Sequence, residues 1–172
     1  MELSYRDYAM ALAGIRESES YQQSLQYWKE RLPEMPPAPA LPLACEPANL
    51  KNYHVGHHHF RIPAETWNNI VAIGGKMGLS RSALSLAAYA SLLAAWSRNP
   101  AFTVNVTLFN RLPFHPQVND IAGDFTSMVL LSVAPDPEDT FETLTRRVQD
   151  RMWCDLEHRF VSGVTVLREL AR

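Results

Sequence analysis

The clearest pattern of apolar and polar residues lies in the middle of the chain. Residues 102–109 alternate larger apolar with smaller polar side chains, which predicts a strand with one face in a core. Residues 127–133 are an almost unbroken apolar run of strand length, which predicts a strand covered on both faces. Asn, Pro and Asp residues within 110–120 require the chain to turn between them. We expect the rest of the fold to be organised around these two strands.

Apolar residues at helical spacing predict further helices outside the strands. Their expected ranges are 5–13, 20–32, 64–77, 80–98, 141–157 and a last helix that starts near Ser162 or Gly163. The helix over 80–98 is apolar nearly all round, with Leu92 and Trp96 included, so we expect it to be buried. Prolines within 33–50 predict an extended connector, and residues 52–62 are a candidate strand. The order of these elements predicts a mixed α/β (α+β) fold in which helices cover a small sheet.

Composition and charge exclude several classes of protein. With 172 residues and 47% hydrophobic content, the chain is long enough for a domain with a core. Its 16 basic and 18 acidic residues are interspersed and give a net charge of −2, so we expect neither nucleic acid nor a membrane as a partner. The N-terminus has no basic and apolar leader, and no run of about 18 apolar residues occurs, which predicts a cytoplasmic protein.

The helix expected over 141–157 carries an acidic residue on its apolar side. One arc of this helix is formed by Phe141, Leu144, Val148, Met152 and Leu156. Asp155 falls inside that arc, where a carboxyl group needs a partner or a raised pKa, and the nearby helix C-terminus raises the pKa further. Both effects suit a general acid or base near neutrality. Alternatively, the last turn leaves the core and Asp155 pairs with Arg151 or His158 at the surface.

Two other groups of polar residues are candidates for chemistry. Asp124 and Thr126 lie two residues apart at the start of the second central strand and would point to the same side of the sheet. Alternatively, Asp124 belongs to a turn and Thr126 is an ordinary strand residue. On a strand, His57 and His59 would share a face, but no Cys, Asp or Glu lies nearby at ligand spacing. We therefore expect a solvated strand face and no metal site there.

Short motifs along nearly the whole chain match one enzyme family in the same order. They are Ser-Tyr-Arg-Asp-Tyr at 4–8, Tyr-Trp at 27–28, Leu-Pro at 32–33, Pro-Ala-Leu-Pro-Leu at 39–43, Val-Thr-Leu-Phe-Asn-Arg at 106–111, Gly-Asp-Phe-Thr-Ser at 123–127, Asp-Leu-Glu-His at 155–158, Ser-Gly-Val at 162–164 and Leu-Arg-Glu-Leu at 167–170. With these motifs the sequence resembles the heterocyclisation domains of non-ribosomal peptide synthetases, a branch of the condensation-domain superfamily. These domains make thiazoline and oxazoline rings in siderophores and related peptides.

The resemblance implies a two-lobed, chloramphenicol-acetyltransferase-like fold of which this chain holds one incomplete lobe. Residues 1–50 would end the first lobe and link it, through helices and a proline-rich strap, to a partial second lobe formed by 51–172. The family's first-lobe motif Asp-x-x-x-x-Asp-x-x-Ser is not found, so we expect the chain to be inactive alone. The histidines also fail the His-His-x-x-x-Asp-Gly pattern of amide-forming condensation domains, because Ile62 or Pro63 stands where Asp is required.

The resemblance also implies a reaction. A complete domain condenses a carrier-bound acyl thioester with Cys, Ser or Thr and then cyclodehydrates the product. By resemblance, the groups for cyclodehydration carry over to Thr126 and Asp155, with Asp124 a weaker candidate. No cofactor would be bound directly, since peptidyl or aryl carrier protein domains deliver phosphopantetheine-bound substrates; neighbouring synthetase domains and the first lobe are further expected partners. The alternatives are one lobe of an amide-forming condensation domain, or an inert fragment that docks a carrier protein.

Overall fold

The computed structural model describes residues 2–51 and 54–170. These residues form two strands, six α-helices and four short 3-10 turns, and they divide into two compact units. The first unit comprises the chain up to Pro37, Phe102–Ser132 and the part from Arg151 onward. The second unit comprises Ala38–Ala101 and Val133–Asp150. Each unit therefore combines segments that are far apart in the sequence.

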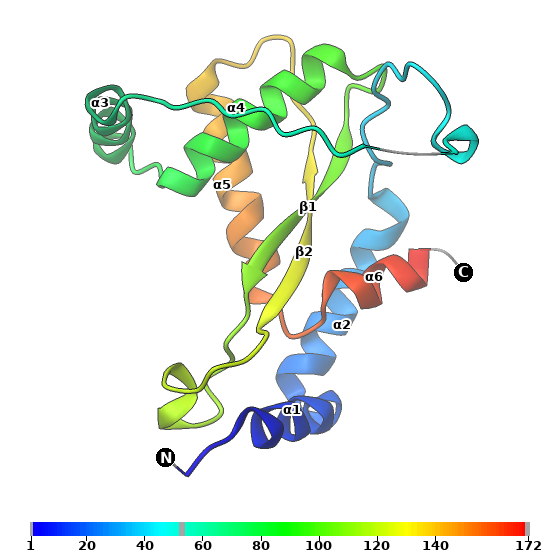
Figure 1. Ribbon diagram of the computed structural model, residues 1–172, viewed down its shortest axis with the longest axis vertical. Coiled ribbons are helices and arrows are strands. Elements are labelled where there is room, and N and C mark those ends of the chain that lie inside the picture. Colours follow the sequence, from blue (N-terminus) through cyan, green and yellow to red (C-terminus); the bar gives the residue numbers. More distant parts are fainter. Residues whose placement is uncertain (1, 52–53, 171–172) are drawn as a thin grey trace. The chain divides into compact units, whose positions relative to one another are not determined.

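The sheet consists of β1 (Phe102–Phe109) and β2 (Thr126–Val133), which run in opposite directions (Figure 1). Three successive residues of β2, Val129, Leu130 and Leu131, are at most 1% exposed. Because successive side chains of a strand point to opposite faces, both faces of this part of β2 are covered. The prediction of two central strands, the second buried on both sides, is confirmed.

The loop between the two strands is held by α1 (Tyr5–Gly14). The hydroxyl of Tyr8 donates to the carbonyl of Asn110 at 2.9 Å and accepts from the amide of Leu112 at 3.1 Å. The ring of Tyr8 belongs to an apolar cluster with Val118, Ile121 and Phe125. The loop is therefore anchored at its start and at its end, and its end leads directly into β2.

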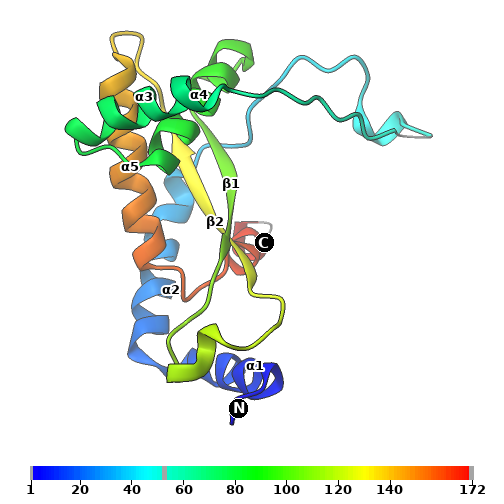
Figure 2. The same ribbon diagram turned by 60° about the vertical axis from the view of Figure 1, so that its left-hand side comes forward.

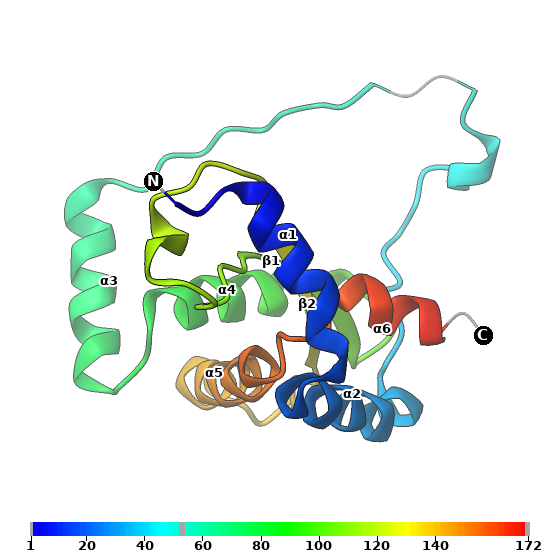
Figure 3. The same ribbon diagram turned by 90° about the horizontal axis from the view of Figure 1, so that it is seen from below.

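Two helices, α2 (Glu19–Arg31) and α6 (Gly163–Leu170), lie side by side near β2 (Figure 3). Their shared core contains Trp28, Leu130, Val161 and Val166. The indole of Trp28 is 1% exposed and donates its N–H to the carbonyl of His158 at 3.0 Å, just after α5 (Phe141–Glu157). A large ring is thus buried with its polar atom satisfied, which fixes the end of α5 against α2.

The second unit contains α3 (Ala64–Lys76), α4 (Arg81–Trp96) and the first part of α5 (Figure 2). Gly78 has a φ of 72° between α3 and α4, a left-handed conformation that glycine adopts without steric cost. The hydroxyl of Ser80 caps the first turn of α4, and its amide donates to the side chain of Gln149 at 2.7 Å. This contact joins the start of α4 to α5.

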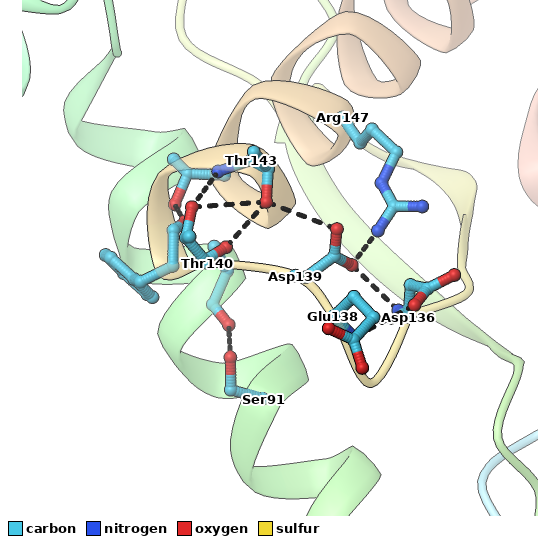
Figure 4. Close-up of polar contacts among 10 residues, drawn as sticks. Ser91, Asp136, Glu138, Asp139, Thr140, Thr143 and Arg147 are labelled. Carbon is cyan, nitrogen blue, oxygen red and sulfur yellow. Dashed lines mark hydrogen bonds and ion pairs between the residues drawn. The ribbon is translucent and has the colours of Figure 1, made fainter.

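Polar residues determine where α5 begins (Figure 4). The hydroxyl of Thr140 accepts the amide N–H of Thr143 at 3.1 Å, as an N-cap residue does. The carboxylate of Asp139 pairs with Arg147 and accepts a hydrogen bond from the hydroxyl of Thr143 at 3.2 Å. An anion in this position also suits the positive end of the helix dipole. These contacts explain why the helix starts at Phe141.

The expected strand over 52–62 is wrong for residues 54–62, and Asn52 and Tyr53 lie outside the described residues. Residues 54–62 form an exposed connector in which the Phe60 side chain is 90% accessible to solvent. No strand of the described chain pairs with this segment, and a single extended segment is not stable as a strand without such a partner. The three histidines at 57–59 therefore lie on an exposed connector and not on a strand face.

The expectation that the fourth helix is buried all round is also wrong. Ala83, Leu84, Ala87, Ala90 and Leu93 are buried, but Leu92 and Trp96 are 59% and 62% exposed. Phe141 at the start of α5 is also exposed, whereas Leu144, Val148 and Met152 are buried as predicted. Apolar side chains on the outer face of α4 have no neighbours within the described residues that cover them. None of the described helices is long and apolar enough to cross a membrane.

Gly163 offers a test of how tightly α6 approaches β2. A Cβ atom added at Gly163 would lie 2.9 Å from the backbone oxygen of Met128, so we expect Gly163→Ala to lower the free energy of unfolding by about 1–3 kcal/mol. Gly75 of α3 is the matched control, because nothing lies within 4 Å of its added Cβ. Gly75→Ala should raise helix stability by about 0.5–1 kcal/mol. Urea denaturation of both variants gives the comparison, and equal effects would contradict the close approach.

Candidate functional site

Asp155 lies on the last turn of α5, and its side chain is 0% exposed. Its oxygen Oδ1 accepts a hydrogen bond of 2.7 Å from the hydroxyl of Tyr27 and forms an ion pair with the guanidinium of Arg31. Both partners come from α2. The prediction that Asp155 faces the interior is confirmed, and the alternative that it pairs at the surface with Arg151 or His158 is wrong.

The second oxygen of the Asp155 carboxyl group has no such partners. Oδ2 is buried and accepts no hydrogen bond from residues 2–51 or 54–170. Burial raises the pKa of Asp155, and the hydrogen bond from Tyr27 and the charges of Arg31 and Arg151 oppose this rise without cancelling it. A carboxyl group with a raised pKa and one free oxygen is chemically suited to exchange a proton.

Arg31 is itself held in place by several contacts. Its Nη2 donates to the hydroxyl of Ser132 on β2 at 3.3 Å, and its guanidinium carbon lies 5.2 Å from the ring centre of Trp28. The ring of His158 stacks on that of Tyr27 with 3.9 Å between their centres. Burial raises the pKa of Tyr27 and lowers that of His158. We define Tyr27, Arg31, Ser132, Asp155 and His158 as the Asp155 cluster.

Sequence reasoning missed Tyr27 and Arg31 as members of a candidate site. Their spacing of four residues places both on one face of α2, and this spacing was the available signal. It did not show what that face contacts, because Asp155 is 124 residues further along the chain from Arg31.

Asp124 shapes the turn into β2. Its Oδ1 accepts the amide N–H of Thr126 at 2.9 Å, and hydrogen bonding to Thr126 lowers the pKa of Asp124. The hydroxyl of Tyr5 donates to the carbonyl of Asp124 at 2.6 Å, and the ring of Tyr5 closes on Gly123, where an added Cβ would collide with it. Asp124 is therefore an exposed carboxylate with a local structural contact.

A cavity of about 270 Å³ lies beside this turn. The residues that line it include Tyr5, Tyr8, Asn110, Asp124, Thr126 and Arg159. The structure thus brings Asp124 and Thr126 to one cavity, as expected of two side chains on the same side. Asp155 is not among the lining residues and lies in the Asp155 cluster instead. A shared role of Thr126 and Asp155 in one reaction stays a prediction.

The opposite pKa shifts of the two acids predict opposite pH dependences of stability. Asp155 binds its proton more tightly when folded, so its contribution to stability is present below pH 3.8 and is lost as the pH rises through its raised pKa. The contribution of Asp124 is present above pH 3.8 and is lost as the pH falls through its lowered pKa. The measurement is the free energy of unfolding as a function of pH for the wild type and for each Asp→Asn variant. Asp155→Asn should lose the decrease in stability with rising pH, and Asp124→Asn should lose the increase. Slopes of the same sign would contradict the assignment.

Comparisons with known proteins place the chain in a family. A model of the condensation domain family matches residues 1–162. The chain is 38% identical over its full length to pyochelin synthetase PchF of Pseudomonas aeruginosa and 32% identical to phenyloxazoline synthase MbtB of a Mycobacterium species. It spans 10% and 15% of the lengths of these two proteins.

A solved structure matches the whole chain as well. The EpoB NRPS cyclization-docking bidomain from Sorangium cellulosum superimposes with a TM-score of 0.93 at 44% identity, and the match covers 100% of this chain and 35% of that one. The mixed α/β fold class expected from the sequence is therefore confirmed. Together, the family model and the matching fold show that the chain belongs to the condensation domain family.

Proposed function

We propose that this chain is part of a heterocyclisation domain of a non-ribosomal peptide synthetase. The observation that carries the proposal is the 44% identity over the whole chain to a cyclization bidomain, together with a TM-score of 0.93. The relatives named as a pyochelin synthetase and a phenyloxazoline synthase support the same reaction class. The complete domain joins a carrier-bound acyl thioester to a Cys, Ser or Thr on a second carrier and converts the product to a thiazoline or oxazoline.

The two halves of this reaction make different demands on the protein. A thioester is already activated, so amide formation requires mainly that the reactants are positioned. In cyclodehydration, the side-chain thiol or hydroxyl adds to the amide carbonyl carbon. The carbonyl oxygen then leaves as water while a carbon–nitrogen double bond forms and the nitrogen loses its proton. These steps need a group that donates and accepts protons near neutral pH.

Two residues of the first unit have properties that suit cyclodehydration, the half-reaction that requires proton transfer. The pKa of Asp155 is raised, and its Oδ2 accepts no hydrogen bond within residues 2–51 and 54–170; both features suit the transfer of a proton to the leaving hydroxyl. Thr126 presents a hydroxyl at the entrance of β2 beside the cavity, where it can hydrogen-bond a substrate. The low pKa of Asp124 makes it a poor acid, so we assign it to the turn.

The proposed partners follow from the reaction. Peptidyl or aryl carrier protein domains deliver both substrates on phosphopantetheine, and neighbouring synthetase domains load them. The chain alone is expected to be inactive, because the first-lobe motif of the family is not found in it.

Substitution of the two proposed residues in the intact domain separates the two half-reactions. With acyl- and cysteinyl-carrier proteins as substrates, Asp155→Asn and Thr126→Val should each slow ring formation by about a hundredfold or more, while linear amide accumulates. Mass spectrometry of the carrier-bound products measures both species. Glu142→Gln is the control, since this exposed carboxylate pairs with Arg146 in the second unit.

Three outcomes of this experiment are informative. Unchanged ring yield in both variants would reject the residue assignment. Linear amide as the sole product of the wild type would reject ring formation and favour an amide-forming condensation domain. Neither product from the wild type would favour an inert, carrier-docking role.

A further inference from the structure

We propose that Tyr27 and Arg31 are positioning residues that hold Oδ1 of Asp155, so that Oδ2 is the oxygen that carries and transfers the proton in cyclodehydration. This inference rests on the proposed function. It adds two residues of α2 to the proposed active site and assigns the transferred proton to one oxygen atom of Asp155.

The donors around Asp155 are distributed unequally between its two oxygens. The hydroxyl of Tyr27 and Nη1 of Arg31 both donate to Oδ1, and that nitrogen also lies 3.1 Å from the Tyr27 hydroxyl oxygen. Oδ2 is buried and receives no hydrogen bond from any residue that the structure describes. A proton on Oδ1 would face the N–H of Arg31 and displace the donated hydrogen bonds. Protonation of this carboxyl group is therefore directed to Oδ2.

The charged and titratable groups that face Asp155 come from two helices. Tyr27 and Arg31 on α2 contact it directly, and Arg151 on α5 adds a positive charge one turn away. His158 stacks on Tyr27, and burial favours its neutral form by lowering its pKa. Arg31 and Tyr27 therefore favour the carboxylate form, while burial favours the protonated form. Opposing influences of this kind suit a group that donates and later accepts a proton.

The side chain of Arg31 has little freedom to leave this position. Its Nη2 donates to Ser132, whose hydroxyl lies 3.4 Å from that of Thr103. Thr103 is in turn bound through its hydroxyl to the carbonyl of Pro36 at 2.7 Å. The guanidinium also lies over the rings of Tyr27 and Trp28. Contacts with the sheet and with α2 thus hold the guanidinium of Arg31 in place, and the guanidinium in turn holds Oδ1 of Asp155.

The proton balance of the step is simple. The amide oxygen becomes a hydroxyl on the tetrahedral carbon after the thiol or hydroxyl of the acceptor adds and passes on its proton. Oδ2–H donates its proton to this hydroxyl, which leaves as water, and the carbon–nitrogen double bond forms as the nitrogen loses its proton. The Asp155 carboxylate then takes up one proton and is restored. No oxidant or metal ion is required.

The competing role is a purely structural one, in which the Asp155–Arg31 pair only ties α5 to α2. The two roles differ in the pH dependence of catalysis. Removing either donor from Oδ1 raises the pKa of Asp155, because both favour the carboxylate. If Asp155 transfers the proton, the corresponding limb of the pH–rate profile of ring formation moves to higher pH. If the pair is structural, stability falls but that limb does not move.

The test measures ring and linear-amide formation by the intact domain as a function of pH. We expect Tyr27→Phe and Arg31→Gln each to move the limb upward by about one pH unit or more, with amide formation retained. Arg31→Lys keeps the charge and should move it less. Arg147→Gln is the matched control, since it removes an ion pair with Asp139 in the second unit and should leave the profile unchanged.

The experiment remains informative if one of the variants does not fold. Tyr27→Phe keeps the aromatic ring that packs on Trp28 and His158, so it remains informative if Arg31→Gln does not fold. An unmoved profile in Tyr27→Phe, or equal loss of amide and ring in every variant, would overturn the inference. If Asp155→Asn stops ring formation while Tyr27→Phe leaves the profile unchanged, the inference fails and the proposed function stands. If the wild type makes no ring at all, the proposed function itself fails.

Discussion

A carboxyl group that has lost its hydration water needs partners that stay in place. Asp155 is in this position at the end of α5, and Tyr27 and Arg31 of α2 are its partners. Removing one member of a buried ion pair leaves an uncompensated charge, which typically costs about 3–5 kcal/mol. The surrounding packing therefore has to keep α2, the end of α5 and Ser132 of β2 in fixed positions relative to one another. Trp28 of α2 packs in the core and donates a hydrogen bond to the carbonyl of His158, and it thereby holds the end of α5 against α2.

The two acids of the first unit show how environment separates identical side chains. Asp124 is exposed and accepts a backbone hydrogen bond, so its pKa is lowered and it remains a carboxylate. Asp155 is buried, so its pKa is raised, and its Oδ2 accepts no hydrogen bond from the residues that the structure describes. Titratable groups whose pKa values are pushed apart are a common basis for assigning acid and base roles. This contrast supports the proposal that Asp155 transfers the proton, whereas Asp124 belongs to a turn.

Most helices and both strands follow from local pattern. The apolar run of β2 predicted its burial on both faces, and the projection of α5 placed Asp155 inside the molecule. The errors have one physical origin. Residues 54–62 were expected to form a strand, but a strand needs a partner, and the described chain supplies none for them. Likewise, an apolar side chain such as Trp96 on α4 is buried only if something packs on that face.

For the candidate site too, the sequence predicted what depends on nearby residues and did not predict contacts between distant ones. Helical periodicity and the turn residues before β2 were sufficient to single out Asp155, Asp124 and Thr126, because each depends on neighbours a few residues away. The partners of Asp155 were not predictable, since Arg31 lies 124 residues earlier and meets it only when α2 packs against α5. Packing also placed Thr126 on the cavity and Asp155 in a separate cluster. Periodicity tells which way a side chain points along its own helix or strand, whereas the group that it meets depends on how distant segments pack together.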